Sequence, residues 1–223
     1  MTTLRSLIDT QAPGRQTPLF ETRQGNMELL VDVPGAPLKG IALIAHPQPL
    51  LGGSARHKIP FSLARALSDD GWLAIRPNFR GVGRSEGEHD QGEGESDDLL
   101  YLVHALRDAW PALPIALIGF SFGAYVQARV ANALAQSGQP AEHVVLLGLP
   151  VGLVPDGRFY ATPSLASDTL LIHGEHDEHA PLALLSAHVR QPPIPIVMVP
   201  GADHFFSNSM ALLLALVRQA LVI

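Results

Sequence analysis

Short apolar runs alternate with helical patterns along most of the chain, and this alternation restricts the fold more than any other feature of the sequence. A short continuous apolar run is typical of a strand that is buried on both faces of a sheet. Between the runs, apolar residues recur at three- and four-residue spacing, as along one face of a helix. Strands alternating with helices predict an α/β fold, with a mostly parallel sheet and helices on both of its faces. The runs span residues 40–45, 72–75, 115–118, 144–147, 170–172 and 196–199.

Two further strands are expected ahead of this region. Residues 20–23 and 27–33 flank Gln24, Gly25 and Asn26, a pattern typical of an antiparallel hairpin, here at an edge of the sheet. The expected sheet therefore has about eight strands. Neither a change in composition nor an internal repeat divides the sequence, so we expect residues 1–223 to form one domain. Helices are expected around residues 61–67, 99–106, 125–134, 184–189 and 212–220, and an additional acidic stretch, 86–98, should hold a helix start capped at residues 96–98.

Composition and charge exclude several classes of protein. The chain is 47% hydrophobic and 16% charged, too apolar for disorder and sufficient for a sizeable core. The absence of cysteine excludes disulfides, a thiolate nucleophile and thiolate metal ligands. A formal net charge of −6 argues against a nucleic-acid partner, which would need a clustered basic face. There is no apolar signal segment at the amino end, and residues 210–217 are too few to cross a bilayer, so we expect a cytoplasmic protein with no membrane partner.

The strongest functional signal is the pentapeptide 119–123, Gly-Phe-Ser-Phe-Gly, which follows one predicted strand and precedes a predicted helix. This is the G-x-S-x-G nucleophile elbow in the strand–turn–helix context that it requires. A serine at the tip of so sharp a turn takes strained backbone angles, and the flanking glycines leave room where side chains would collide. The amino end of the following helix favours negative charge beside the serine. Ser121 is therefore the candidate nucleophile.

A serine hydroxyl needs a base to become an effective nucleophile, and the base needs an acid to orient it. After this elbow the expected chain order is serine, acid, histidine. Asp177 follows the run 170–172 and His204 follows the run 196–199. Both would then lie beyond the carboxyl ends of parallel strands, the edge where open α/β sheets build their sites. Other acids stand close enough in sequence to take the place of Asp177: Glu175, Glu178 and Asp203.

These motifs and two others form an ordered set between about residue 40 and residue 204. The set comprises His-Pro-Gln-Pro at 46–49 with Gly-Gly at 52–53, Asn-Phe-Arg-Gly-Val-Gly-Arg-Ser at 78–85, the elbow at 119–123, His-Gly-Glu-His-Asp at 173–177 and Gly-Ala-Asp-His at 201–204. In this order the chain resembles the α/β-hydrolases, and among them the small, lid-less serine hydrolases related to dienelactone hydrolase. The resemblance implies that Ser121 is the nucleophile, Asp177 the orienting acid and His204 the base, with no cofactor.

The nucleophile elbow and the resemblance together imply an oxyanion hole made of two backbone N–H groups. One belongs to Phe122, the residue after the nucleophile. The other is expected within residues 46–49, where the two prolines have no N–H to give and Gln48 is the natural donor. The family pattern at this segment is His-Pro-His-Pro with a later Asn-Lys, whereas this chain has Gln48 and the pair His57-Lys58. A backbone donor survives such a change, but side-chain contacts with a substrate need not.

Two other chemical interpretations of the motifs are weaker. The histidines of the segment 173–179 and their neighbouring carboxylates suit zinc, but loop histidines seldom converge without a further constraint and H-E-x-x-H is absent. We therefore expect no metal. Residues 78–87 contain Gly81 and Gly83 but lack a third glycine at the spacing of G-x-G-x-x-G, and they lack the lysine of a P-loop. Arg80 is expected to brace this loop rather than to bind phosphate.

The segment 152–168 is short and rich in proline and glycine, so no helical lid fits there and the serine should be open to solvent. This favours small or extended substrates. We expect a serine hydrolase that cleaves small carboxylic esters through an acyl-enzyme. Thioesterase, lactonase, deacetylase or peptidase activity stays open, as does a non-catalytic ligand- or partner-binding role, and the chain could be a monomer or a small homo-oligomer. An apolar wall of the site, or alternatively the core, would take four aromatic residues: Phe159, Tyr160, Phe205 and Phe206.

Overall fold

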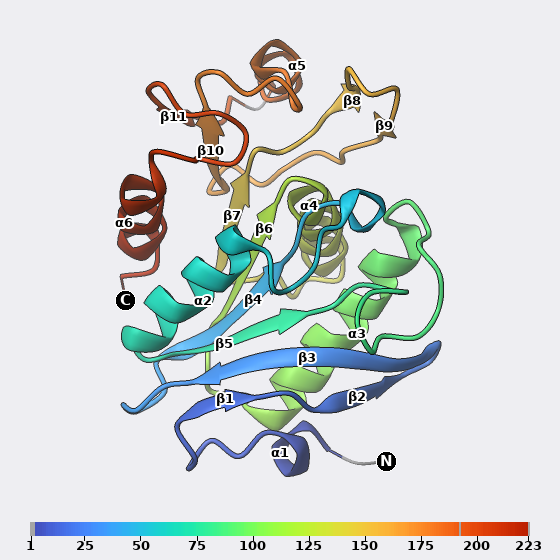
Figure 1. Cartoon of the computed structure of the whole chain (residues 1–223), viewed down its shortest axis with the longest axis vertical. Coiled ribbons are helices and arrows are strands. Elements are labelled where there is room, and N and C mark those ends of the chain that lie inside the picture. The colour runs from blue at the N-terminus through green and yellow to red at the C-terminus, as the bar shows by residue number, and fades with distance from the viewer. Residues whose placement is uncertain (1–2, 192, 223) are drawn as a thin grey trace.

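The computed structural model describes residues 3–191 and 193–222, and its centre is a twisted sheet between two layers of helices (Figure 1). All the predicted apolar runs form strands, and these strands pair in parallel in the order β5-β4-β6-β7-β10-β11. The prediction of an α/β fold with a mostly parallel sheet is confirmed. The parallel strands are β4 (Gly40–Ala45), β5 (Trp72–Pro77), β6 (Ile115–Phe120), β7 (His143–Leu147), β10 (Leu170–Gly174) and β11 (Ile196–Val199).

Three antiparallel strands extend the sheet beyond β5. The predicted hairpin is present as β2 (Leu19–Thr22) and β3 (Gly25–Val33), and β3 pairs with β5. The far half of β3 also pairs with β1 (Gly14–Gln16), so β1 and β2 together form this edge. The strand β1 was not predicted, because three residues are too few to show an alternating pattern.

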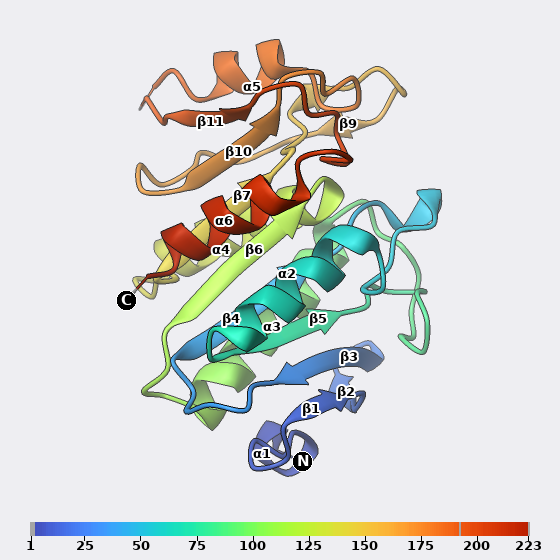
Figure 2. The ribbon, with the colours of Figure 1, turned by 60° about the vertical axis from the view of Figure 1, so that its left-hand side comes forward.

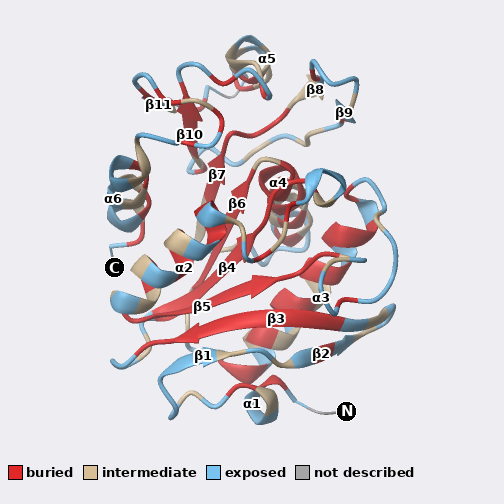
Figure 3. Cartoon of the chain, in the orientation of Figure 1, coloured by how far each residue is buried: buried red, intermediate tan, exposed pale blue. Residues whose placement is uncertain are grey.

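The helices cover both faces of the sheet (Figure 2). Helices α2 (Lys58–Asp69) and α6 (Met210–Ala220) pack on one face, and α3 (Glu93–Ala109) and α4 (Phe122–Gln136) on the other. Alternate residues of each central strand therefore enter different hydrophobic clusters, as Leu73 and Ala74 of β5 do. Figure 3 shows the central strands buried along their length. Two short helices, α1 (Leu4–Leu7) and α5 (Leu182–His188), lie near the ends of the sheet.

Helix α3 begins earlier than the sequence pattern suggested. Its first residue is Glu93, and the carboxylate of Glu95, fully buried, accepts the N–H groups of Gly92 and Asp90 at 2.9 Å each. The expected cap at residues 96–98 was wrong because a glycine in a left-handed conformation, Gly92, starts the helix instead. A glycine carries no side-chain oxygen, so its capping function falls to the glutamate three residues later.

The carboxyl ends of the parallel strands meet along one edge of the sheet. The register places Ala45 beside Gly119, Phe120 beside Leu147 and Gly174 beside Val199. The segments that follow β4, β6, β10 and β11 therefore emerge side by side. The connection from β7 to β10 contains only a small antiparallel hairpin, β8 (Gly152–Leu153) with β9 (Phe159–Tyr160), and no helix. No helix of the described residues is both long and apolar enough to span a membrane.

Candidate active site

Ser121 lies at the tip of the sharp turn between β6 and α4. Its backbone has φ 56° and ψ −122°, a left-handed strained conformation for a residue with a side chain. Its N–H donates to Leu147 of β7, and its carbonyl accepts from Ala124 in the first turn of α4. A Cβ on Gly119 would come within 2.3 Å of the Gly123 carbonyl oxygen. The two flanking glycines thus allow the close approach that the turn requires.

Three predicted residues meet at the carboxyl edge of the sheet. His204 Nε2 lies 2.9 Å from Ser121 Oγ, and His204 Nδ1 lies 2.7 Å from Asp177 Oδ2. An ionised carboxylate can only accept a hydrogen bond, so Nδ1 carries the proton and Nε2 accepts the serine hydroxyl. Ser121 is partly exposed, whereas His204 and Asp177 are buried.

Both oxygens of the Asp177 carboxylate accept hydrogen bonds. Its Oδ1 accepts the N–H groups of His179 and Ala180 at 2.9 and 2.8 Å, while its Oδ2 faces His204. Burial by itself raises the pKa of Asp177, but the hydrogen bond and charge of His204 and the Ala180 N–H outweigh burial and hold this pKa below its usual value. The carboxylate is therefore ionised at neutral pH.

The alternative acids make other contacts. Glu175 is exposed and accepts the N–H of Gly201 at 2.8 Å, and Asp203 accepts the N–H and hydroxyl of Ser207 at 2.9 and 2.7 Å. Glu178 is exposed. Of these four acids, Asp177 is the one that hydrogen-bonds His204.

The other histidines of this segment are dispersed. The ring of His173 is fully buried, with Nε2 3.7 Å from Asp177 Oδ2, whereas His176 is exposed. Burial lowers the pKa of His173 and outweighs the opposing charge of Asp177. Within residues 3–191 and 193–222, no three histidine, aspartate or glutamate side chains are grouped as metal ligands would be.

The segment after β4 forms the opposite wall of the site. His46 is fully buried; its Nε2 accepts the Phe79 N–H at 3.0 Å, so its Nδ1 carries the proton and donates to the Pro47 carbonyl at 2.7 Å. Gln48 caps the short 3₁₀ helix η1 (Pro49–Leu51), and its side-chain oxygen accepts the Leu50 N–H at 3.4 Å. Phe122 is the first residue of α4, where an N–H has no partner within the helix.

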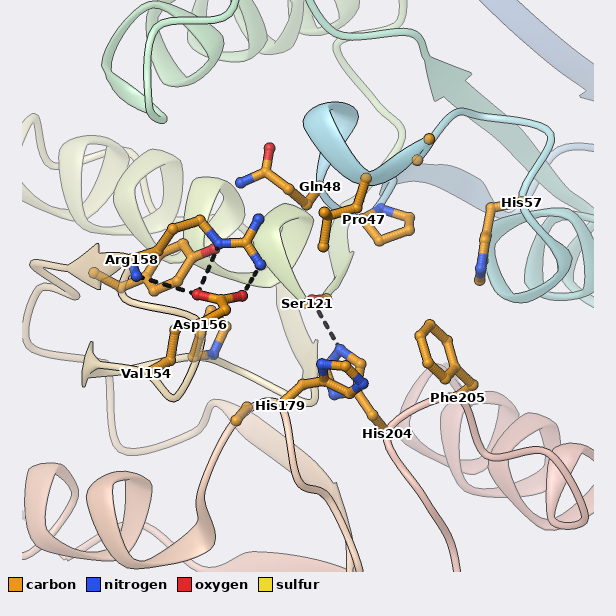
Figure 4. A pocket seen from close by; sticks show the side chains of 16 residues that line it. Pro47, Gln48, His57, Ser121, Val154, Asp156, Arg158, His179, His204 and Phe205 are labelled. Carbon is orange, nitrogen blue, oxygen red and sulfur yellow. Dashed lines mark hydrogen bonds and ion pairs between the residues drawn. The ribbon is translucent and has the colours of Figure 1, made fainter.

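Ser121 opens into a pocket of about 100 Å³ (Figure 4). Gln48 and Pro47 lie on one side of it, and His57 and Phe205 on another. The β8–β9 hairpin closes a third side with residues that sequence reasoning missed, Asp156 and Arg158, which form an ion pair beside the pocket. Of the four candidate wall aromatics, Phe205 and Tyr160 line the pocket, Phe206 is buried in the core, and Phe159 is exposed.

Arg80 braces its loop, as expected. Its Nε and Nη2 bond both carboxylate oxygens of Asp98 in α3, at 2.5 and 3.0 Å. The bidentate contact joins the loop after β5 to the amino-terminal half of the helix. The pKa of Arg80 lies above its usual value chiefly because of this hydrogen bond.

Known proteins resemble this chain in both sequence and structure. A family model described as alpha/beta hydrolase fold matches residues 50–152. An uncharacterized protein of Rickettsia prowazekii is 30% identical over 198 residues, which are 84% of this chain and 80% of the relative.

Two solved structures share both fold and sequence. An alpha-beta serine hydrolase homologue from Coxiella burnetii is 32% identical, with 95% of this chain and 99% of that chain covered and a TM-score of 0.81. A serine hydrolase without a lid from Xanthomonas campestris is 29% identical, with 94% of both chains covered and a TM-score of 0.81. Dienelactone hydrolase from Anabaena variabilis, at 19% identity and a TM-score of 0.73, shares the fold over 93% of this chain and 96% of its own. This chain therefore belongs to the α/β-hydrolase family, and the solved structures similar to it include a serine hydrolase without a lid.

Proposed function

We propose that this α/β hydrolase cleaves small carboxylic esters through an acyl-enzyme formed on Ser121. The observation that carries the proposal is the continuous hydrogen-bond chain from Ser121 Oγ through the ring of His204 to Asp177. A serine so connected can lose its proton to the imidazole as it attacks a carbonyl carbon. The opening of the pocket at Ser121 gives a substrate access to that oxygen.

The reaction has two acyl-transfer steps. Ser121 Oγ forms a bond with the ester carbonyl carbon while His204 Nε2 accepts its proton. His204 then gives that proton to the departing alkoxide, and an acyl-enzyme remains. Water, deprotonated by His204 in the same way, attacks the acyl-enzyme, and His204 returns the proton to Ser121 Oγ as the bond to that oxygen breaks and the acid is released. Asp177 keeps the proton of the neutral ring on Nδ1 and stabilises the imidazolium when it forms.

The oxyanion of each tetrahedral intermediate is assigned to the N–H groups of Gln48 and Phe122. The amino end of α4 reinforces the second donor, because its unpaired N–H groups and dipole favour negative charge. The peptide that carries the first donor is held by His46, which bonds its carbonyl oxygen on Pro47. Each such donor is worth roughly 3 kcal/mol of transition-state stabilisation.

The size of the pocket favours small substrates. Its volume of about 100 Å³ lies below the 300–1,000 Å³ typical of pockets that enclose drug-sized ligands. The connection between β7 and β10 has no helix that could fold over a long acyl chain. We therefore expect turnover to fall as the acyl chain of an ester lengthens.

Covalent labelling with a fluorophosphonate, read by intact mass, tests the proposal. The parent protein and Ser207→Ala, which alters an exposed serine outside the pocket, should each gain one label and hydrolyse short esters. Ser121→Ala should gain none, and its kcat should fall at least about 1,000-fold, as for loss of a triad nucleophile. A folded parent protein that takes no label would contradict the proposal and favour a ligand-binding role, whereas labelling without ester turnover would direct the search to thioesters, lactones and amides.

A further inference from the structure

The β8–β9 hairpin brings two charged side chains to the pocket of Ser121. Val154, Asp156, Arg158 and Tyr160 all line that pocket, and they come from the hairpin or its turn. Of the residues that line the pocket, Asp156 and Arg158 are the ones that carry a permanent charge. They lie across the pocket from His57 and Phe205 (Figure 4).

The pair is held in place by its own turn. Arg158 Nε lies 3.1 Å from Asp156 Oδ1, and its Nη2 bonds Asp156 Oδ2. The Arg158 backbone N–H also donates to Asp156 Oδ1 at 3.1 Å, so a local Asp turn fixes the carboxylate. Burial alone would raise the pKa of Asp156, but the hydrogen bonds of Arg158 outweigh burial and keep this pKa below its usual value.

The pair keeps hydrogen-bonding capacity for a ligand. The side chains of Arg158 and Asp156 are 29% and 38% exposed, so a ligand in the pocket can reach both. Arg158 Nη1 has no hydrogen bond to any described residue, and Asp156 Oδ2, which accepts one hydrogen bond, has a further lone pair, whereas Oδ1 already accepts two. A donor and an acceptor therefore stand side by side, with no net charge.

This arrangement discriminates between polar groups. A carboxylate bound at Arg158 would face the carboxylate of Asp156, and the repulsion offsets the attraction. A carboxamide or hydroxyl can donate to Asp156 and accept from Arg158 at once, so it leaves neither charged group without a partner. An alkyl group satisfies neither.

We propose that Asp156 and Arg158 form a charge-neutral polar subsite, which selects esters with an uncharged hydrogen-bonding end group over esters with a carboxylate there. This inference rests on the proposed hydrolase function of Ser121 and adds the substrate class of that same site.

Three methyl esters of matched shape test the subsite on the acyl side: methyl succinamate, monomethyl succinate and methyl 4-methylpentanoate. They share the leaving group and chain and differ only in a carboxamide, carboxylate or isopropyl end. Three acetates carry the same ends on the alcohol side: 2-carbamoylethyl, 2-carboxyethyl and 3-methylbutyl acetate. With the full chain at pH 8, kcat/KM for the carboxamide should exceed that for the carboxylate about tenfold in at least one set.

Asp156→Asn is the decisive variant, because Asn can keep the turn while it leaves the charge of Arg158 uncompensated. In the responding set, the carboxamide-to-carboxylate ratio of kcat/KM should fall at least about fivefold, and added salt should weaken the change. The double variant Asp156→Asn/Arg158→Gln should restore the ratio to within about twofold of the parent, because no charge remains. Asp168→Asn, an exposed acid of the same connection outside the pocket, should leave the ratio unchanged.

The subsite proposal is overturned if the parent protein prefers the carboxylate ester. It is also overturned if Asp156→Asn lowers the carboxamide-to-carboxylate ratio of kcat/KM by less than fivefold in both sets of esters. Fluorophosphonate labelling of Ser121 is measured on the same preparations. A parent protein that takes no label would count against the proposed function itself. Normal labelling and turnover, with the same kcat/KM for the carboxamide and carboxylate esters, would reject only the subsite.

Discussion

His46 shows how one buried side chain can control a reacting group that it does not touch. The peptide between Pro47 and Gln48 is planar, with its C=O and N–H pointing in opposite directions. Because His46 Nδ1 holds the C=O of Pro47, it also fixes the direction of the Gln48 N–H. The second ring nitrogen accepts the N–H of Phe79, and this bond requires a neutral ring, because a protonated ring has no nitrogen that can accept. We therefore regard His46 as a positioning residue for the proposed oxyanion hole.

The pH dependence of stability tests this description. Burial, opposed in part by the bond to Pro47, lowers the pKa of His46 to about 3. Between about pH 6.5 and 3 the unfolded chain binds a proton at this residue that the folded chain does not, so stability is lost as the pH falls through that range. From pH 6.5 to pH 5 the loss from His46 is about 2 kcal/mol.

His46→Phe removes both the proton site and the two hydrogen bonds. Urea unfolding at pH 7.5 should find it less stable than the parent by about 1–3 kcal/mol for each buried group left without a partner. That gap should narrow by about 2 kcal/mol at pH 5, because only the parent still has to keep a buried histidine neutral. A gap that stays constant with pH would mean that His46 is not the neutral buried ring described here. With kcat measured as well, a fall at unchanged KM would support its positioning role.

Among single residues, some members of the site could be predicted from the sequence and others could not. Ser121, Asp177 and His204 follow predicted strands in a fixed order, so parallel topology alone brings their positions to one edge. Asp156 and Arg158 could not be found in this way. They lie in a turn between two-residue strands, where no hydrophobic period indicates which way a side chain points. The only indication in the sequence was that two opposite charges, Asp156 and Arg158, flank Gly157.

At the scale of secondary-structure elements, the sharp turn that carries Ser121 depends on how closely helix α4 approaches strand β4. Gly123 lies in the first turn of α4, and a Cβ there would come within 2.4 Å of the Ala45 carbonyl oxygen and 2.6 Å of that of His46. Both contacts are with backbone, which cannot rotate away as a side chain can. The missing side chain therefore lets the helix amino end reach the strand ends around Ser121.

Gly123→Ala should destabilise the protein by about 1–3 kcal/mol, as overpacking does, although alanine is the better helix former by about 1 kcal/mol. Fluorophosphonate labelling of Ser121 should also slow. Gly35→Ala is the matched control, since a Cβ there meets nothing within 4 Å, and its stability should change by no more than about 0.5 kcal/mol. Urea unfolding checks both, and a Gly123→Ala protein as stable as the parent would contradict the close packing.

Elements that bury an apolar stripe could be predicted, and those that owe their conformation to turn geometry could not. The parallel strands and the helices that cover them were found from hydrophobic period. The strands β1, β8 and β9 were missed, as was η1, because each has two or three residues. The start of α3 was misplaced because Gly92 takes a left-handed conformation that no apolar pattern reports.

At the scale of the whole molecule, the sheet is shared by two hydrophobic clusters. In β4, Ile41, Leu43 and Ala45 face the cluster of α3 and α4, while Ala42 and Ile44 face that of α2 and α6. Loss of either helical layer would expose one face of the strands on which the other layer rests. We therefore propose that residues 1–223 unfold as one cooperative unit, as expected of a chain that forms one domain.

The two tryptophans allow this to be measured, because each belongs to a different cluster. Trp72 packs with α2 and α6, and Trp110 at the end of α3 packs in the other cluster. In Trp110→Phe the remaining fluorescence reports the first layer, and in Trp72→Phe it reports the second. For each variant, urea unfolding followed by fluorescence and by far-ultraviolet circular dichroism should give coincident curves, since a shared sheet cannot lose one layer alone. Separate midpoints within one variant would divide the two faces into independent units, and the one-domain proposal would fail.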